Sequence, residues 1–453
     1  MNKITACLLV VALFALPVVF AACGGGGSKV INSTYTVTYN ANNATGGSVP
    51  IDSNNYAQGQ TVTVLGNTGN LVKTGYSFTD WNTLANGTGT AYTQGQTFTM
   101  DGVNVTLYAQ WTASVVTGYA YVTNQMSQNI SQYTIGANGA LTPMSPATVA
   151  AGSEPIAIAI APSANYVYAG NNQDGTVSQY TIGTNGALTP MSPATVTTGT
   201  GTPWPSSVAV DPSGTYAYVV NEQAPSYGNV ISFTIGTNGT LSSLSGPYPV
   251  GNDMLWSIAI HPSGKYAYVT SVRNDYIVYQ YTIGANGALQ AMTPASVPAG
   301  SGPRQVTIHP SGKYAYVACF DFGTIFQYTI DPNSGALTPM STDSVTAGPQ
   351  PFTITVDPSG KYAYVPNWNG NNVSQYTIDP NSGALTPMTT ATVATGTAPL
   401  TLAVDPSGKY AYVTNSGDND ISQYTIGADG SLTAMPNTVP TGSNPWSIVT
   451  VKN

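Results

Sequence analysis

Charged side chains are scarce in this sequence. They make up 6% of its 453 residues, against roughly 25% in an ordinary globular protein. Ten basic and eighteen acidic residues leave a net charge of -8. This balance excludes nucleic acid as a partner, because too few cations are present to neutralise a phosphate backbone. Gly, Thr, Ser, Asn and Tyr are abundant instead, a composition typical of an exported, turn-rich, all-β protein.

Histidine and cysteine are also rare. The chain has two histidines and three cysteines, whereas a structural zinc site usually needs about four such ligands. The acidic run Asp418-Asn419-Asp420 is a weak hint of calcium, because three residues lack the rest of a ligand loop. We therefore expect neither a metal site nor a cofactor.

The N-terminus has the pattern of a secretory signal. After Lys3, an apolar run from Ile4 to Ala22 ends in small residues before Cys23, as in a signal peptide with its cleavage site. The run is marginal for a bilayer span, which needs about 20 residues. The stretch resembles a bacterial lipobox, which implies cleavage before Cys23 and a lipid on its side chain. Gly24 then favours an outer-membrane or cell-surface location.

Cleavage at that site changes the cysteine count. Cys7 leaves with the signal peptide over residues 1–22, and acylated Cys23 begins a Gly/Ser tether over residues 23–32. Cys319 is then the only thiol, so no intramolecular disulfide is possible. Because Cys319 ends a predicted strand, we expect an inert, buried thiol.

Residues 33–113 have a pattern of their own. Thr, Val and Tyr alternate between Gly and Asn turns, which predicts five or six strands. The order YTVTYNAN, KTGYSFTDWN, GTGTAYTQGQTFTM and VNVTLYAQWT resembles one Listeria-Bacteroides repeat module, the β-grasp-like unit of internalins. The resemblance implies a surface spacer or adhesion element with no chemistry of its own. A rigid stalk is the simpler interpretation.

Residues 114–453 repeat with a period near 48. The motif PSGKYAYV marks the period, and its prolines have successive spacings of 50, 50, 48, 48 and 48 residues. Each unit reads as an apolar strand, a DPSG turn, a Tyr-rich strand, a variable tip, an SQYTI strand, a GAL turn and a last strand. Four strands per unit at this period predict the blades of a β-propeller.

The two ends of this region predict how the ring closes. The first unit starts at Gly118 without its leading strand, and the chain ends with a leading strand, Pro445 to Val451, that has no follower. Joining the two completes a seventh blade and leaves no exposed sheet edge. We predict an all-β protein with a seven-bladed propeller closed by its C-terminal strand.

The repeat resembles two overlapping families. YVTN at Tyr121–Asn124 and at Tyr412–Asn415 matches the YVTN repeat of microbial surface proteins. The whole PSGKYAYV, SQYTI and GAL pattern is similar to the lactonase propeller family, which includes 6-phosphogluconolactonases. The shared motifs are blade scaffold, so the resemblance implies fold more strongly than activity.

Most repeated residues have structural interpretations. Asp at the start of the DPSG turn caps the turn backbone, and this applies to Asp211, Asp357 and Asp405. His261 and His309 occupy the same turn slot and are expected to be structural as well. Paired tyrosines such as Tyr266 and Tyr268 lie on one strand face and pack between blades.

Rare residues gather on the opposite face, where the variable tips and the blade-to-blade links lie. We expect ligand contacts there from strand-entry residues beside the central channel and from one tip tryptophan: Trp204, Trp256, Arg304, Phe352, Leu400, Trp446 and, in a tip, Trp368. An aromatic mouth with one guanidinium suits a sugar or another planar, weakly anionic ligand.

If the protein is a lactonase, the catalytic candidates are Glu154, Glu222, Arg273 and Arg304. Such an enzyme would need Glu154 or Glu222 within about 3 to 4 Å of a basic partner. The leading hypothesis is instead a lipid-anchored propeller that binds an extracellular small molecule, glycan or protein without catalysis. A lactone hydrolase is the second hypothesis, and a surface-layer component is the third.

Overall fold

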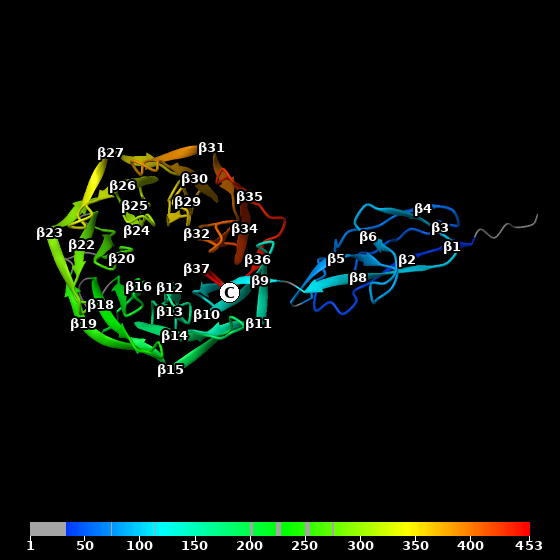
Figure 1. Cartoon of the computed structure of the whole chain (residues 1–453), viewed down its shortest axis with the longest axis horizontal. Helices are drawn as coiled ribbons and strands as arrows, with labels where there is room; N and C mark the ends of the chain where they lie inside the picture. Colours follow the sequence, from blue (N-terminus) through cyan, green and yellow to red (C-terminus); the bar gives the residue numbers. More distant parts are fainter. Residues whose placement is uncertain are drawn as a thin grey trace, which may run out of the picture. The chain divides into compact units, whose positions relative to one another are not determined.

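The computed structural model describes residues 33–73, 75–113, 115–199, 203–222, 228–249, 254–273 and 276–453. The expected signal peptide, the tether and the lipidation site Cys23 lie outside these residues. The chain divides into two compact units, one ending at Thr112 and one from Ala113 to Asn453 (Figure 1). In the part of the chain described, no helix is long and apolar enough to cross a membrane.

The smaller unit has a four-stranded sheet in the order β2-β8-β5-β6, with β2 and β8 parallel, and two strand pairs, β1 with β3 and β4 with β7. Its core centres on Trp81, which is 1% exposed and has the Tyr39 ring edge-on at 4.7 Å. The strands are β1 (Thr34–Tyr35), β2 (Val37–Asn40), β3 (Tyr56–Ala57), β4 (Thr61–Thr63), β5 (Tyr76–Asn82), β6 (Ala91–Tyr92), β7 (Thr97–Thr99) and β8 (Val105–Ala113).

The larger unit is a ring of seven blades, each an antiparallel sheet (Figure 1). From the inner strand outward, blades 1 to 3 are β37 (Pro445–Lys452), β9 (Val116–Asn124), β10 (Asn129–Gly136) and β11 (Leu141–Ala150); β12 (Pro155–Ile160), β13 (Tyr166–Asn171), β14 (Thr176–Ile182) and β15 (Leu188–Thr197); and β16 (Pro205–Val210), β17 (Tyr216–Asn221), β18 (Asn229–Ile235) and β19 (Leu241–Pro249).

Blades 4 to 7 follow the same order. They are β20 (Leu255–Ile260), β21 (Tyr266–Ser271), β22 (Ile277–Ile283) and β23 (Leu289–Pro298); β24 (Pro303–Ile308), β25 (Tyr314–Cys319), β26 (Thr324–Ile330) and β27 (Leu337–Thr346); β28 (Thr355–Val356), β29 (Tyr362–Asn367), β30 (Asn372–Ile378) and β31 (Leu385–Ala394); and β32 (Pro399–Val404), β33 (Tyr410–Asn415), β34 (Asp420–Ile426), β35 (Leu432–Ala434) and β36 (Val439–Pro440).

The predicted closure of the ring is confirmed. β37 pairs antiparallel with β9, and the register sets Val451 opposite Tyr119 and Ile448 opposite Val122. The last strand of the chain is thereby the inner strand of the first blade. Because both ends of the unit meet in one sheet, the propeller has no free edge at the point of closure.

Side chains of the repeat join each blade to the next. The Tyr268 hydroxyl donates to the carbonyl of Gly335 in the following blade at 2.6 Å, and Leu337 N donates to the Gln280 side-chain oxygen at 2.6 Å. Gly335 has a φ of +74° and lies so close to Tyr266 that a Cβ would be 2.4 Å from its ring. Equivalent hydroxyl bonds are made by Tyr121, Tyr168, Tyr218, Tyr316, Tyr364 and Tyr412.

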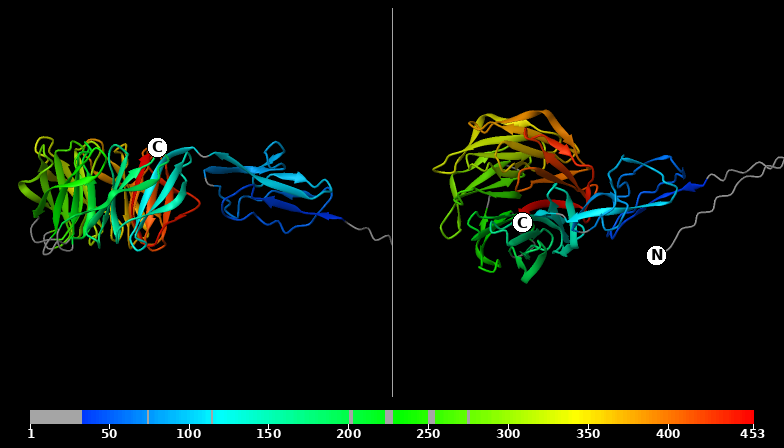
Figure 2. Two further views of the ribbon diagram at one scale, coloured as in Figure 1. Left: turned by 90° about the horizontal axis from the view of Figure 1, so that it is seen from below. Right: turned by 45° about the vertical axis from the view of Figure 1, so that its right-hand side comes forward.

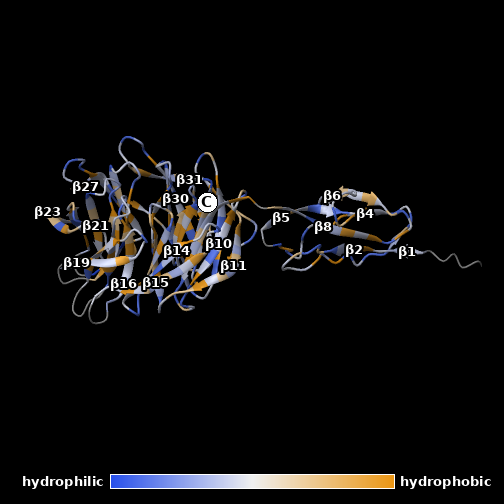
Figure 3. Cartoon of the chain, turned by 60° about the horizontal axis from the view of Figure 1, so that its bottom comes forward, coloured by the Kyte–Doolittle hydropathy of each residue, from blue (hydrophilic) through white to orange (hydrophobic). Residues whose placement is uncertain are grey.

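The strands run between two faces of the disk (Figure 2). We call the face with the PSG and GAL turns the turn face, and the face with the variable tips and blade-to-blade links the mouth face. The strands carry both hydrophobic and hydrophilic residues (Figure 3). The second strand of a blade is buried along almost its whole length, as in β13 and β25, because neighbouring blades cover both of its faces. The seven inner strands surround the central channel, which opens on the mouth face.

Blade 6 departs from the pattern, because its inner strand β28 has only two residues. Its partner β29 carries Pro366 where blades 1, 4 and 7 have threonine. The Pro366 carbonyl accepts from Phe352 N at 3.0 Å, so its backbone faces the inner strand. Proline has no N–H to return, and the ladder is interrupted there.

Candidate active site

One residue per blade takes the same register at the mouth-facing start of the inner strand. We call this set the entry ring: Trp446, Ile156, Ser206, Trp256, Arg304, Phe352 and Leu400 in blades 1 to 7. In six blades a proline comes directly before the entry-ring residue. Proline has no N–H to donate to the strand ladder, so it is suited to the start of a strand. The entry ring thus places the rare side chains of blades 4 to 6 at the channel.

A second ring lies just after the Tyr-rich strand of each blade. We call it the tip ring: Gln125, Asn172, Glu222, Val272, Phe320, Trp368 and Ser416. Each of these residues donates its backbone N–H to a carbonyl in the link that leads into the inner strand of its blade, as Phe320 does to Gly302 at 2.9 Å and Trp368 to Gln350 at 2.9 Å. The shared bond fixes both rings in register on the mouth face.

Arg304 lies at the centre of an aromatic cluster. Its guanidinium carbon is 4.1 Å from the centre of the Trp256 ring, 5.0 Å from Phe320 and 5.8 Å from Phe352, within cation–π range. The buried Nε has no hydrogen-bond partner among the described residues. A half-buried guanidinium held by ring faces keeps donors for a ligand, whereas one held by carboxylates would not.

The aromatic rings of the cluster also contact one another. Phe352 is edge-on to Trp256 at 6.1 Å, to Phe320 at 6.1 Å and to Trp446 at 5.8 Å, and Trp368 lies 6.2 Å from Phe320. Edge-to-face pairs at these separations are favourable. They hold the wall of the mouth along blades 4, 5, 6 and 1.

Glu222 brings the opposite charge to the mouth. Burial raises the pKa of its carboxyl, and the charges of Arg304 and Arg273 and a hydrogen bond from Asn172 oppose that shift only in part. Burial likewise lowers the pKa of Arg304, against the charges of Glu222 and Asp321. The charges of Glu222 and Arg304 therefore interact. The raised pKa makes Glu222 a better proton acceptor than an exposed carboxylate.

Beneath the entry ring, the channel contains a polar cavity of about 170 Å³. Its wall includes Trp256, Phe352 and Trp446 and the residues that follow the entry ring, among them Ser207, Ser257, Gln305, Thr353, Thr401 and Ser447. Two of these hydroxyls are engaged with backbone, because Thr353 donates to Leu400 O at 3.0 Å and Thr401 to Trp446 O at 2.9 Å. The site therefore has an aromatic rim over a hydroxyl-lined base.

Among the described residues, the contact of about 3 to 4 Å between a glutamate and a basic group that we expected a lactonase to need is not formed. Within the described residues, neither Glu154 nor Glu222 forms an ion pair with a basic group at 4.0 Å or less. Glu154 instead accepts from the Gln125 amide at 3.0 Å. Arg273 is exposed, so of the four catalytic candidates only Glu222 and Arg304 are half-buried in the mouth and coupled by charge.

The expected position of Trp204 is also wrong. The inner strand of blade 3 starts at Pro205, so the entry-ring residue is Ser206 and Trp204 precedes it. Trp204 is 38% exposed and is absent from the lining of the channel cavity. Pro203 and Pro205 flank Trp204, and Pro205 is the one equivalent to the proline that starts the inner strand in other blades. Of the remaining expected contacts, Trp256, Arg304, Phe352, Trp368 and Trp446 come together, and Leu400 is a buried member of the ring.

Several residues outside the mouth have structural roles. Asp211 accepts from Thr215 N and Tyr216 N in its own turn. Asp418 accepts from Thr397 N at 2.6 Å and Asp420 from the Asn415 amide at 2.7 Å, so both carboxylates are used to hold loops. His261 and His309 lie on the turn face, and each ring bonds a glycine carbonyl of the next blade.

The sequence-based prediction missed Phe320 and Asn172. Both belong to the tip ring, and that register could have been found by aligning the residue after each Tyr-rich strand across the seven units. In this alignment Glu222, Phe320 and Trp368 occupy one position in blades 3, 5 and 6. Within a single unit each tip has the pattern of a variable loop, so the shared position becomes visible only when the seven units are aligned.

Comparison with known proteins identifies the larger unit. The family described as "Lactonase, 7-bladed beta-propeller" matches residues 113–449. The chain belongs to this lactonase propeller family. The Listeria-Bacteroides repeat domain matches residues 35–110. Both predicted resemblances are confirmed, and the lactonase match spans both rings of the mouth.

Solved structures show the same fold. A candidate 6-phosphogluconolactonase from Bacteroides fragilis is 22% identical, with a TM-score of 0.64, and the match covers 74% of this chain and 98% of that one. The periplasmic gluconolactonase PpgL of Pseudomonas aeruginosa is 21% identical, with a TM-score of 0.64, over 74% of this chain and 99% of that one. At these identities the likeness establishes the propeller fold alone.

A curated relative matches over a short stretch. A candidate Gly-rich membrane protein of Evansella cellulosilytica is 44% identical over 77 residues, which is 15% of this chain and 9% of that protein. A second candidate membrane protein of the same organism is 35% identical over 82 residues, 12% of its length. The chain thus spans only a small part of these relatives.

Proposed function

We propose that this lactonase-family protein hydrolyses a sugar lactone at the mouth of its propeller. The observation that supports the proposal is Arg304, a half-buried guanidinium stacked on Trp256 at 4.1 Å with an unpartnered Nε. Its charge acts on Glu222, a carboxylate whose pKa is raised by burial. Family membership supports the same reaction. We infer a site made of Arg304 and Glu222 from blades 5 and 3.

In this proposal the lactone ring stacks on the aromatic rim, and its carbonyl oxygen accepts from Arg304. Glu222 takes a proton from a water as that water attacks the carbonyl carbon, and Arg304 stabilises the oxyanion. The carbon–oxygen bond of the ring then breaks, and Glu222 returns the proton to the departing oxygen. This cycle does not need the glutamate–base contact of about 3 to 4 Å that we expected of a lactonase. A direct Glu222–Arg304 ion pair would instead lower the basicity of the carboxylate and occupy the guanidinium.

Acid release from D-glucono-1,5-lactone in a pH-stat tests this proposal. The purified protein should exceed the spontaneous rate. Glu222→Gln should lower kcat by about 10²- to 10⁴-fold, the usual contribution of a general base, and Arg304→Ala by about 10²- to 10³-fold, the usual effect of one oxyanion donor. Glu154→Gln serves as the matched carboxylate variant and should retain activity, because Gln125 holds Glu154. Equal activity in all four proteins would exclude the proposed site.

The charges at Arg304 favour a neutral lactone. Arg304 and Arg273 are balanced by Glu222 and Asp321, the charged groups that act on Arg304. A phosphate ester carries about -1.5 to -2 charges at neutral pH and needs an excess of cations. We expect kcat/KM to be at least about tenfold higher for gluconolactone than for its 6-phosphate, since one unbalanced charge contact is worth about 1.4 kcal/mol or more. The reverse preference would contradict this charge argument.

A second candidate function is ligand binding without turnover. It is favoured by the exposed aromatic side chains of the mouth face: Trp368 at 39%, Trp204 at 38%, Tyr276 at 37% and Phe322 at 71%. Exposed aromatic faces suit a glycan. Quenching of tryptophan fluorescence by a sugar, with no lactone turnover, would favour this function over hydrolysis.

We also propose that the protein is exported and attached to the cell envelope by a lipid on Cys23. The lipobox-like sequence before Cys23 and the membrane-protein names of two short-range relatives support this. Mass spectrometry of the N-terminal peptide should show an acylated Cys23, and Cys23→Ser should release the protein from the membrane fraction. An uncleaved N-terminus would argue against it. In this arrangement residues 33–113 would act as the spacer.

A further inference from the structure

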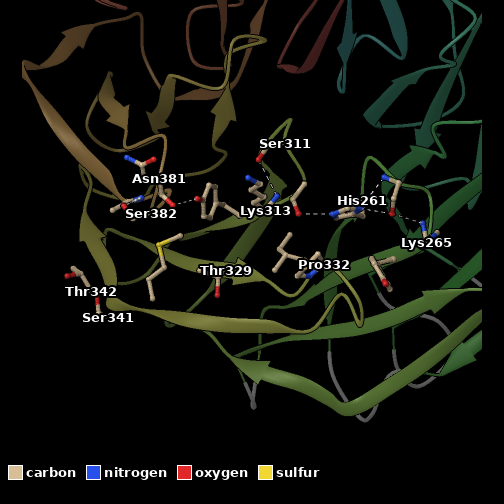
Figure 4. A pocket seen from close by; sticks show the side chains of 17 residues that line it. His261, Lys265, Ser311, Lys313, Thr329, Pro332, Ser341, Thr342, Asn381 and Ser382 are labelled. Carbon is tan, nitrogen blue, oxygen red and sulfur yellow. Dashed lines mark hydrogen bonds between the residues drawn. The ribbon is translucent and has the colours of Figure 1, made fainter.

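A large groove lies on the turn face, away from the mouth. Its volume is about 700 Å³, within the range of about 300 to 1,000 Å³ typical of small-molecule sites. Blades 4 and 5 supply most of its wall, and Asn381 and Ser382 of blade 6 close one end (Figure 4). From this groove we propose a second binding site, for a phosphate monoester with an apolar body, in which Lys265 and Lys313 bind the phosphate.

The wall of the groove is positively charged. Among the residues that line the groove, Lys265 and Lys313 are cationic and none is acidic. In Figure 4 the two lysines lie on either side of His261. Two cations on one wall match the charge of about -1.5 to -2 on a phosphate monoester at neutral pH. This is unusual in a chain with a net charge of -8.

The blade repeat shows that this charge is specific to blades 4 and 5. In blade 3 the turn has Asp211 at its first position and Thr215, rather than a lysine, at its fifth. In blades 6 and 7 the fifth position is a lysine, Lys361 or Lys409, and the first is an aspartate. Blades 4 and 5 have histidine in place of that Asp, together with a lysine. Blade 2 has Ala161 and Asn165 at these positions. Of the six turns in blades 2 to 7, only those of blades 4 and 5 therefore carry a lysine without a turn carboxylate.

The His261 ring takes the place of the turn aspartate through its own hydrogen bonds. Its Nδ1 accepts from Ser263 N at 3.1 Å, and its Nε2 donates to Gly312 O in the next blade at 2.8 Å. The role that aspartate has in the other turns is thus filled by a group without negative charge. His261 also joins blade 4 to blade 5 within the wall of the groove.

Between its serine and threonine side chains, the wall also has a fixed apolar surface. Tyr266 and Tyr314 donate their hydroxyls to Asn333 O and Asn381 O, each at 2.6 Å, so their rings are fixed between blades. Ile330, Pro332 and Met340 complete the apolar surface. A rigid apolar wall beside two cations is suited to the organic part of a phosphate ester.

The nearest acidic turn residues do not offset the lysines within the groove. Asp331 and Asp379 are outside its lining. Each caps its own turn, Asp331 by accepting from Asn333 N and from Ser334 N and Oγ. A smaller groove of about 410 Å³ lies next to the first, shares Lys313 with it and adds Lys361. The turn of Lys361 differs from those of blades 4 and 5, because it keeps the carboxylate of Asp357, which accepts from Lys361 N at 2.9 Å.

Calorimetric titration of the full protein with phenyl phosphate tests this site. We expect one phenyl phosphate per chain and no binding of benzyl alcohol, its uncharged counterpart. In K265A/K313A the affinity should fall by at least about tenfold, since a charge-assisted hydrogen bond is worth that or more. Lys409→Ala, the matched lysine of blade 7, should leave the affinity within about twofold of the wild type.

The possible outcomes separate clearly. Loss in K265A/K313A with retention in Lys409→Ala supports the groove, provided that both variants melt at the wild-type temperature. If K265A/K313A melts early, Lys265→Gln and Lys313→Gln singly replace it. No binding by the wild type, unchanged binding in K265A/K313A, or equal loss in Lys409→Ala would each overturn the proposal. An unchanged affinity would also place phenyl phosphate elsewhere, for instance at Arg304.

Discussion

Burial of Glu222 raises the basicity of its carboxylate and also destabilises the fold at neutral pH. A carboxyl whose pKa is raised in the folded state binds its proton more tightly there than in the unfolded chain. Stability is therefore unaffected below the unfolded value of about 4.3 and is lost as the pH rises through that value toward the folded pKa. At neutral pH the charged form destabilises the fold.

Glu222→Gln should accordingly raise the melting temperature at pH 7 while it lowers the turnover of a lactone. At pH 3 the two proteins should melt nearly together, because Glu222 is then almost fully protonated in both states. Differential scanning calorimetry at the two pH values measures the effect. A variant that melts below the wild type at pH 7 would mean that the charged carboxylate stabilises the mouth.

Cys319 shows burial without function. Its side chain is fully buried, and burial raises the pKa of its thiol to about 12, so almost none of it is thiolate at neutral pH. A protein of residues 33–453, in which Cys319 is the one cysteine, should resist iodoacetamide while folded and react once after unfolding, as intact-mass measurement would show. Alkylation of the folded protein at pH 7.5 would contradict this burial.

At the scale of elements, Pro366 interrupts the inner ladder of blade 6. Pro366→Thr restores the backbone N–H that blades 1, 4 and 7 have at this position. It should extend β28 and stabilise the propeller by about 1 kcal/mol, the net value of one hydrogen bond. Urea unfolding of the variant and the wild type measures the difference. A destabilised variant would mean that Phe352 depends on the interrupted strand for its place in the mouth.

The elements were largely predictable, because each blade repeats the same turn and strand chemistry. Ring closure through Pro445 to Lys452 followed from two incomplete units that fit each other. The site was predictable only in part. Trp204 was assigned two residues out of register because Pro203 and Pro205 both resemble a strand start, and Phe320 was missed because it lies in a tip. The repeat period can be found from the sequence, but side-chain contacts between different blades cannot be derived from the sequence of one repeat.

At the scale of the whole molecule, buried tyrosines join the blades. Tyr133, Tyr180, Tyr376 and Tyr424 each donate to a backbone carbonyl of the preceding blade at 2.6 to 2.7 Å. Burial raises the pKa of each to about 12. The folded state therefore holds these protons at a pH where the unfolded chain has begun to lose them.

The propeller should thus lose stability above pH 10. A raised pKa leaves stability intact below the unfolded tyrosine value of about 10, and each group then removes about 1.4 kcal/mol per pH unit up to its folded pKa. The urea midpoint should be flat from pH 7 to 9 and fall steeply beyond 10. A midpoint that stays flat to pH 11.5 would show that these hydroxyls are not retained as donors.

The central claim is that, in the propeller mouth, Glu222 acts as a general base and Arg304 as the oxyanion donor. The pH dependence of kcat/KM for D-glucono-1,5-lactone, measured from pH 4 to 7 on the wild type and Glu222→Gln, tests it most directly. The wild type should gain activity along an acidic limb whose pKa lies above the ordinary glutamate value of about 4.3, and the variant should lack that limb. The same limb in both proteins, or no turnover by either, would contradict the account.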